Sequence, residues 1–119
     1  MKITNPFIVK LHYSFQTADK LYFVFDFVNG GDLYTYMVDR DKLEEDIVRF
    51  YAAEILVALK ALHEEGVIHR DLKPHNIMID HEGHIKLIDF GLSRIGESSE
   101  RNANSIVGTP NYIAPEILK

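Results

Sequence analysis

The sequence of 119 residues contains no cysteine, which excludes disulfide bonds and metal sites built from thiolates. It also lacks an excess of basic charge, since 13 lysine and arginine residues face 18 aspartate and glutamate residues. Nucleic acid and anionic membranes bind basic faces, so neither is the expected main partner. Low-complexity tracts and internal repeats are absent as well, and the length is that of one domain.

Long hydrophobic runs are missing too. The first residues, Met1 to Thr4, begin no signal peptide or membrane-spanning segment, and we expect an intracellular protein without membrane insertion. The expected location is the cytoplasm, with the nucleus as the alternative. What is present is the composition of an ordinary soluble domain, with 46% hydrophobic and 26% charged residues.

The hydrophobic pattern predicts a mixed α+β fold. Two apolar stretches rich in β-forming residues, Phe7–Phe15 and Leu21–Val28, are expected to pair as antiparallel strands. Asp32 is placed to cap a short helix. A long helix is expected from about Leu43 to Glu65, and its apolar residues cover more than one stripe. Few partners remain within this chain to cover that helix.

The middle of the chain predicts short strands around a polar loop. A strand at Val67–His69 leads into the loop Arg70–Asn76. Strands at Ile77–Asp80 and Ile85–Ile88 are expected to form a tight hairpin across Glu82-Gly83.

This hairpin is expected to bring two oxygen-bearing side chains together at its open end. With Glu82 and Gly83 as the turn, antiparallel pairing places Asn76 opposite Asp89. A three-residue loop with Gly83 in a bulge would shift the register by one residue and leave the two as close diagonal neighbours. Amide and carboxylate oxygens suit Mg²⁺ that also binds water and phosphate oxygens. The spacing therefore predicts a Mg²⁺ site.

Two charged residues of the preceding loop can serve the same site. Asp71 can orient or deprotonate an attacking hydroxyl, and Lys73 can supply positive charge to a transferred phosphate. Each also has a purely structural interpretation, Asp71 as a turn residue and Lys73 as a solvated surface charge. The set favours phosphoryl transfer, in which a protein mainly places charge.

Three segments resemble the signature motifs of eukaryotic protein kinases. They are His-Arg-Asp-Leu-Lys-Pro-His-Asn ending at Asn76, Asp-Phe-Gly beginning at Asp89, and Gly-Thr-Pro-Asn-Tyr-Ile-Ala-Pro-Glu ending at Glu116. Lys73 and the Gly-Thr-Pro run are similar to the serine/threonine-specific branch, so serine or threonine is the expected acceptor. The stretch Asn5–Leu11, among others, resembles the group of cyclic-nucleotide-dependent and ribosomal-S6 kinases.

The resemblance implies a protein-kinase-like fold, with ATP and Mg²⁺ as cofactors and proteins bearing serine or threonine as substrates. Residues 1–28 would be the last strands of the small lobe and the hinge. Residues 29–119 would begin the helical large lobe, with the catalytic loop and activation segment. Asp71 would be the catalytic base, Lys73 a phosphate contact, and Asn76 and Asp89 the magnesium ligands.

Four residues are implied in ATP binding. The backbone from Asp26 to Val28 would hold adenine as the hinge, and Met78 would lie under the adenine. Asp32 matches an acidic position that contacts ribose or a basic substrate residue. Met78 as packing and Asp32 as a helix cap are the structural alternatives.

Regulation is implied around the polar stretch Ser93–Ser105, which is expected to be a mobile loop. Ser105 falls where relatives carry an activating phosphate added by an upstream kinase. Arg70 and Arg94 are its candidate cationic partners.

Three further residues belong to the implied regulatory set. Phe90 would be part of the regulatory spine, and Thr109 and Glu116 lie in the activation segment.

His84 and the other scattered histidines lack metal-ligand spacing and are interpreted as structural or surface residues.

Several parts of a kinase domain do not occur in this sequence, among them a Gly-rich phosphate loop, a strand lysine with its partner glutamate, and the later helices. We therefore expect a fragment of a serine/threonine kinase that has no turnover alone and exposes apolar surface. One alternative is a short product that binds partners through kinase-like surfaces. Another is a non-catalytic nucleotide-binding domain.

Overall fold

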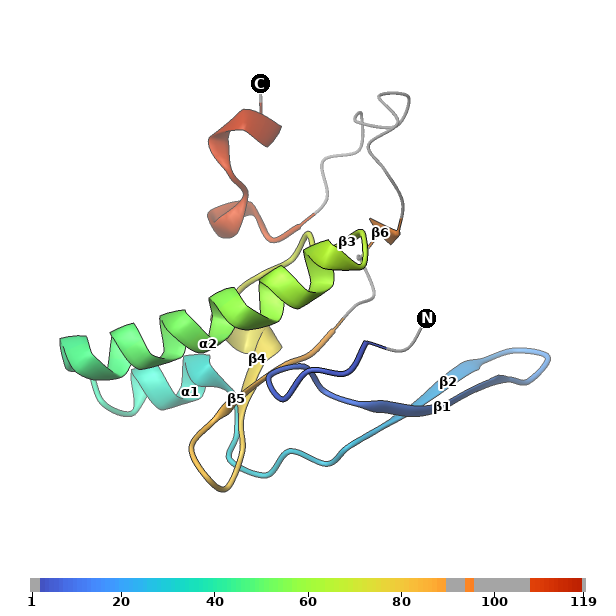
Figure 1. The fold of residues 1–119 in the computed structure, drawn as a ribbon, viewed down its shortest axis with the longest axis horizontal. Helices are drawn as coiled ribbons and strands as arrows, with labels where there is room; N and C mark the ends of the chain where they lie inside the picture. The colour runs from blue at the N-terminus through green and yellow to red at the C-terminus, as the bar shows by residue number, and fades with distance from the viewer. Residues whose placement is uncertain (1–2, 90–93, 96–107, 119) are drawn as a thin grey trace.

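The computed structural model describes residues 3–89, 94–95 and 108–118, and these form a mixed α+β fold (Figure 1). Its elements are β1 (Leu11–Gln16), β2 (Leu21–Phe25), α1 (Leu33–Val38), α2 (Glu45–Glu64), β3 (Val67–Ile68), the 3₁₀ turn η1 (Pro74–Asn76), β4 (Ile77–Ile79), β5 (Ile85–Leu87), β6 (Arg94–Ile95), and the 3₁₀ turns η3 (Pro110–Tyr112) and η4 (Pro115–Ile117). The expected α+β class is confirmed. No helix within the described residues is long and apolar enough to span a membrane.

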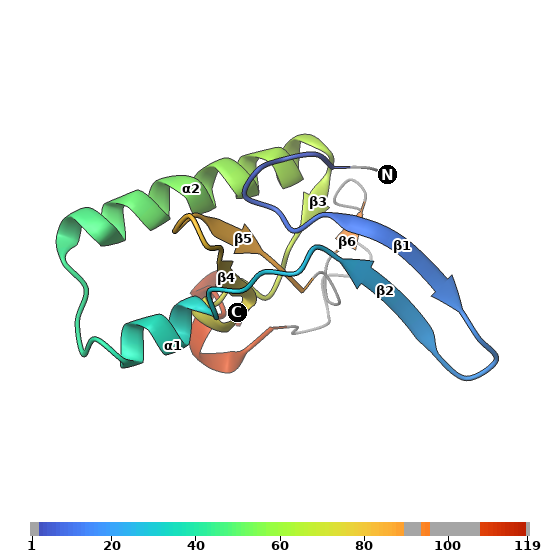
Figure 2. The same ribbon diagram turned by 90° about the horizontal axis from the view of Figure 1, so that it is seen from below.

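Strands β1 and β2 form an antiparallel hairpin that projects from the rest of the chain (Figures 1 and 2). Phe15 faces Tyr22, and their rings stack with centroids 4.9 Å apart. Every residue of both strands is nevertheless exposed. The predicted antiparallel pairing is confirmed, but β2 ends at Phe25 and not at Val28. The expected exposure of apolar surface is confirmed as well.

The segment before β1 does not continue that strand, which corrects the prediction of one strand over Phe7–Phe15. Val9 donates its N–H to the carbonyl of Leu87 at 3.0 Å, and Leu87 donates to the carbonyl of Phe7 at 2.8 Å. Ile8 and Val9 are buried beside β5. Residues 7–9 therefore pair with β5, whose edge is apolar, and the chain pairs with β2 only from Leu11 onward.

Helix α1 begins as the sequence predicts. The Asp32 carboxylate accepts the backbone N–H of Thr35 at 2.9 Å and the Thr35 hydroxyl at 2.8 Å. It thus satisfies a helix-end donor that has no partner within the helix. The structural interpretation of Asp32 as an N-cap is confirmed.

Helix α2 packs on the core along one face, where half-buried Ile55 and Leu59 flank the buried residues, and exposes the opposite face. The buried residues recur every three or four positions and are Tyr51, Glu54, Ala58 and Leu62. On the other side Leu56 is 67% exposed, and Val48 and Val57 are about half exposed. Gly66 follows the helix at a φ of 68°, a left-handed conformation that glycine commonly adopts after a helix.

The β4–β5 hairpin corrects the predicted two-residue turn. Ile79 pairs with Ile85 and Ile77 with Leu87, so three residues connect the Asp80–His84 backbone pair. The Asp80 carboxylate accepts the N–H groups of Glu82 and His84, both at 3.0 Å. Gly83 takes a positive φ of 87°, which makes the longer loop possible.

The shifted register moves the expected neighbours at the open end. Ile88 donates its N–H to the carbonyl of Asn76 at 3.0 Å, so Asn76 lies opposite Ile88 rather than Asp89. This is the alternative with Gly83 in a bulge, and Asp89 follows next along the chain.

Helix α2 lies along the β4–β5 hairpin, and the core lies between them (Figures 1 and 2). Ala58, Leu62, Ile85 and Leu87 are all 0% exposed. Each fully buried leucine or isoleucine contributes about 1.5–3 kcal/mol relative to an exposed one. The core therefore holds the hairpin, and the residues at its open end, against α2.

The linker between β2 and α1 packs closely on β4. Gly30 donates its N–H to the carbonyl of Ile79, and Ile79 donates to the carbonyl of Gly31, both at 2.8 Å. A Cβ atom on Gly30 would lie 2.3 Å from the Ile79 oxygen. Glycine is therefore required at position 30 for this contact.

One further correction concerns the polar stretch Ser93–Ser105. Its residues 94–95 form strand β6, which pairs antiparallel with β3 through Ile68–Arg94 and Val67–Ile95. The rest of that stretch lies outside the described residues. Composition alone missed β6 because a two-residue strand carries no periodicity.

Candidate active site

The site begins at a buried histidine that joins two segments. His69 is 2% exposed, and its Nε2 lies 3.0 Å from the Ile88 carbonyl. Its Nδ1 accepts the backbone N–H of Asp71 at 3.3 Å. Because Nδ1 accepts, the proton resides on Nε2, and the ring ties the loop after β3 to the end of β5. This positioning role of His69 is not evident from the sequence.

The Asp71 carboxylate collects three side-chain donors. Its Oδ1 accepts the Thr109 hydroxyl at 2.7 Å. Its Oδ2 lies 3.1 Å from both the Lys73 ammonium and the Asn76 amide nitrogen. Lys73 also donates to the Thr109 oxygen at 2.6 Å. The structure thus brings together four residues that the sequence placed in the catalytic, metal and regulatory sets.

Charge compensation is strong at this carboxylate, which is 8% exposed. Burial raises the pKa of Asp71, but the Thr109 hydroxyl and the Lys73 ammonium outweigh that effect, and the net pKa is lowered. Asp71 is therefore ionised at neutral pH. A carboxylate offers about four acceptor positions, so one remains for a hydroxyl brought by a substrate.

Replacing Thr109 with valine should raise the pKa of Asp71, because valine keeps the shape and removes the donor. A lowered carboxyl pKa stabilises the folded chain above its ordinary value of 3.8, and that contribution is lost as pH falls through the folded value. The Thr109→Val chain should therefore begin acid unfolding at a higher pH. Circular dichroism between about pH 7 and 2, with an NMR titration of the carboxyl carbon, measures both effects.

Thr109→Ser is the matched control, since serine keeps the hydroxyl, and it should titrate like the unmodified chain. An unchanged pKa of Asp71 in the valine variant would contradict the role of this hydrogen bond.

Asn76 has a fixed orientation. Its Nδ2 donates to the backbone carbonyl of Asp71 at 2.9 Å as well as to the Asp71 carboxylate. Both bonds use the nitrogen side of the amide, so the oxygen Oδ1 faces the other way and is the atom suited to a cation. Asn76 is 6% exposed, and this orientation is part of the packed site.

Two non-glycine residues at the edges of the site have a positive φ. They are Arg70 at 66° and Asp89 at 61°, and both are exposed. Such backbone conformations cost about 1–3 kcal/mol each and cluster at functional sites. At Asp89 the positive φ ends the extended conformation of β5, so the side-chain alternation of a strand no longer applies there.

The donor set fits a magnesium ion held jointly with a phosphate. Asn76 and Asp89 offer hard oxygens, and within the described residues no group of three or more histidine, cysteine, aspartate and glutamate side chains could hold a metal. Mg²⁺ commonly binds through one or two carboxylates together with water and substrate phosphates. The residues present match that mode and not a closed protein cage.

The residues predicted to bind ATP lie in the linker between β2 and α1 and in β4. Asp32 and Met78 form an isolated antiparallel bridge, which brings these two together. Asp26 lies after β2, where its carboxylate contacts His12 Nε2 at 2.5 Å and its N–H donates to the Lys10 carbonyl. The hydrogen bond from His12 lowers the pKa of Asp26, against a smaller opposing effect of burial. Val28 is half-buried in the following linker.

The predicted regulatory residues are only partly placed. The backbone of Arg94 lies in β6, while its side chain, Phe90 and Ser105 lie outside the described residues. Glu116 is exposed in η4. Among the described members of this set, Thr109 contacts the Asp71 carboxylate.

Comparison with known proteins supplies the family. The model of the protein kinase domain matches residues 1–119, which is the whole chain. The chain therefore belongs to the protein kinase domain family. This confirms the resemblance drawn from the three motifs.

The relatives narrow the kinase type. The chain is 52% identical over 118 residues to human ribosomal protein S6 kinase alpha-3 and 53% identical over 115 residues to atypical protein kinase C of Drosophila melanogaster. It is 51% identical over 119 residues to a RAC family serine/threonine-protein kinase homolog of Dictyostelium discoideum. These matches cover 97–99% of this chain but only 16%, 19% and 27% of the three relatives. The chain is thus part of a serine/threonine protein kinase domain, similar to ribosomal S6 kinases.

Proposed function

We propose that this chain supplies the phosphoryl-transfer site of a serine/threonine protein kinase that uses ATP and Mg²⁺. The main support for this proposal is that the Lys73 ammonium, the Thr109 hydroxyl and the Asn76 amide all contact the Asp71 carboxylate. Phosphoryl transfer depends mainly on positioning and on placed charge, and this cluster provides both.

In this proposal Asp71 orients the substrate hydroxyl through its remaining acceptor position. Its lowered pKa keeps it ionised but makes it a weak base toward an ordinary alcohol. The hydroxyl therefore gives up its proton to Asp71 late, once bonding to phosphorus has made the proton acidic. ADP leaves, and Lys73 offsets negative charge on the transferred phosphoryl group.

Asn76 Oδ1 and the Asp89 carboxylate would hold the metal. A bound Mg²⁺ supplies neutralisation of the phosphate oxygens and a template for their orientation. His69 supports this pair, because it links the loop of Asn76 to Ile88, directly before Asp89.

Nucleotide binding is assigned to the linker and to β4. The backbone of Asp26 to Val28 would hold adenine, Met78 would contact the base, and Asp32 would lie near the ribose. Residues 1–28 would accordingly belong to the small lobe and hinge, and residues 29–119 to the large lobe. The bridge between Asp32 and Met78, which makes these two residues neighbours, supports the assignment of nucleotide binding.

Regulation would act on the activation segment. An upstream kinase would phosphorylate Ser105, and the phosphate would pair with Arg70 and Arg94 through charge-assisted hydrogen bonds. Phe90 would pack in the regulatory spine, and Glu116 would be fixed by an arginine of another segment. A cytoplasmic or nuclear location fits protein substrates.

The experiment that tests the function exchanges the matched segment of human ribosomal protein S6 kinase alpha-3 for this chain. We expect the exchanged kinase to phosphorylate a serine/threonine peptide within about tenfold of the unmodified relative, a change of about 1.4 kcal/mol in the barrier. The 119-residue chain alone is expected to show no turnover.

A second candidate function is a kinase-like binding module without activity. It is favoured by the apolar residues exposed on β1, β2 and α2, which would suit a partner. An exchanged kinase that is folded and binds ATP but transfers no phosphate would favour this alternative and contradict the proposed catalysis.

A further inference from the structure

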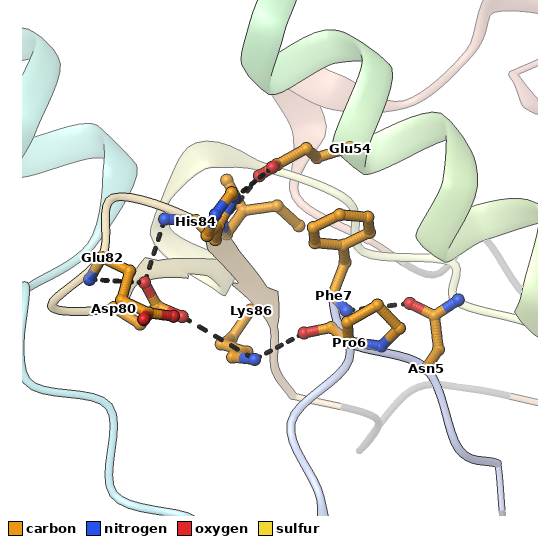
Figure 3. A network of polar contacts seen from close by, with 9 residues as sticks. Asn5, Pro6, Phe7, Glu54, Asp80, Glu82, His84 and Lys86 are labelled. Atoms are coloured by element: carbon orange, nitrogen blue, oxygen red, sulfur yellow. Dashed lines mark hydrogen bonds and ion pairs between the residues drawn. The ribbon is translucent and has the colours of Figure 1, made fainter.

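A second polar cluster lies at the turn end of the β4–β5 hairpin, whereas Asn76 lies at its open end. Figure 3 shows it where three segments meet: residues 5–7, helix α2, and the loop and start of β5. Glu54 of α2 is at its centre and is 6% exposed. One carboxylate oxygen lies 2.6 Å from His84 Nδ1, and the other accepts the N–H of Ile85 at 2.9 Å.

Burial makes this carboxylate dependent on its partners. An ionised carboxylate in a packed interior is costly unless it is hydrogen-bonded and paired with opposite charge. Ile85 supplies a neutral donor. His84 alone supplies a partner whose charge can change near neutral pH, and an imidazolium gives a stronger, charge-assisted bond than neutral imidazole.

The other charged groups around His84 favour its protonated form. Asp80 and Glu82 face it from the hairpin loop, and Lys86 of β5 lies 3.8 Å from Asp80 and donates to the Pro6 carbonyl. Three carboxylates thus surround His84 with one ammonium nearby. The rings of Phe7 and Phe50 lie 6.2 and 5.8 Å from the His84 ring and complete its surroundings.

We propose that Glu54 and His84 form a proton-operated clamp between α2 and the β4–β5 hairpin. When His84 is protonated, the clamp holds the start of β5 on the helix. When the proton leaves, the buried carboxylate loses its counter-charge, and this end of the hairpin loosens. The clamp is inferred from the contacts among Glu54, His84 and Ile85, and it does not depend on the proposed kinase activity.

The direction of the pH effect follows from the pKa of His84. The hydrogen bond to Glu54 raises that pKa above its ordinary value of 6.5, and burial opposes the rise only in part. A raised histidine pKa stabilises the folded chain fully below pH 6.5, and this stabilisation is lost as pH rises through the folded value. The clamp is therefore closed in mildly acidic solution and opens as the solution becomes alkaline.

The test is an NMR titration of the His84 ring in the 119-residue chain. We expect a midpoint above 6.5 in the unmodified chain and a lower midpoint in Glu54→Gln. Glu82→Gln is the matched control, because it removes a carboxylate from the exposed loop without touching the clamp. It should lower the midpoint much less than Glu54→Gln does.

Hydrogen exchange of the Ile85 amide gives a second readout that needs no variant. After correction for the intrinsic effect of pH, its protection should fall as pH rises through the His84 midpoint. A His84 midpoint at or below 6.5, or Ile85 protection independent of pH, overturns the proposal. Equal midpoints for the Glu54→Gln and Glu82→Gln chains overturn it as well.

Discussion

Replacement of Asp71 by asparagine in the exchanged kinase is expected to lower kcat by about 10²–10⁴-fold, the usual contribution of a positioned acid or base. The variant keeps the size of the side chain but cannot take the substrate proton. It also removes the negative charge that Lys73 contacts at 3.1 Å. The KM for ATP should change little, because Asp71 is not among the proposed nucleotide contacts. Steady-state phosphorylation of a serine/threonine peptide measures both constants.

The control for this prediction is Asp19→Asn, at an exposed aspartate in the connection between β1 and β2. It changes the net charge by the same amount and should leave kcat unaltered. If Asp71→Asn retains most of the activity, the assignment of Asp71 is wrong, and another group must orient the hydroxyl.

Truncation of Leu62 to alanine is expected to cost about 2–5 kcal/mol of the free energy of unfolding. Leu62 is 0% exposed in α2 and packs in the core cluster with Ile85 and Leu87. Domains are stable by only about 0.05–0.15 kcal/mol per residue, so this loss is a large share of the total. Urea unfolding measures it as a lower midpoint with an unchanged slope.

Leu56→Ala is the matched comparison, because it makes the same change in the same helix. Leu56 is 67% exposed, and its truncation should alter stability by about 0.5 kcal/mol or less. Similar losses in the two variants would mean that the exposed side of α2 is covered in solution. Gel filtration would then show whether a second copy of the chain covers it.

Much of the site could be predicted because its residues are close in the sequence. Asp71, Lys73 and Asn76 lie within six positions, and local chain geometry makes them neighbours. Thr109 is different, since its hydroxyl meets Lys73 across a separation of 36 residues. The motif placed Thr109 in the activation segment, but only the fold shows that it donates to the Asp71 carboxylate. His69 was missed as a positioning residue because its hydrogen bond to Ile88 is equally non-local.

The hairpin register shows why turn chemistry alone was insufficient. The pair Glu82-Gly83 is compatible with a two-residue turn and with a three-residue loop. The Asp80 carboxylate decides between them, because it accepts two N–H groups of the longer loop. That choice depends on a side-chain rotamer, which hydrophobic patterning does not encode.

The Glu54–His84 contact was also beyond sequence interpretation. The two residues are 30 positions apart, and the scattered spacing of the histidines predicts only a structural or surface role for His84. Glu54 falls on the apolar stripe of α2, where a buried acid is unusual. That anomaly is the one signal by which the sequence could have pointed to a buried partner.

The contact of Gly30 with Ile79 sets a limit on how this molecule can vary. The space between the linker and β4 is filled by a hydrogen atom, since even one methyl group would come within 2.3 Å of a carbonyl oxygen. Asp32 and Met78 bridge the linker and β4 next to this contact, so the added methyl group would move these two residues apart. An alanine at position 30 would thus widen the gap between the linker and β4 without replacing Asp32 or Met78.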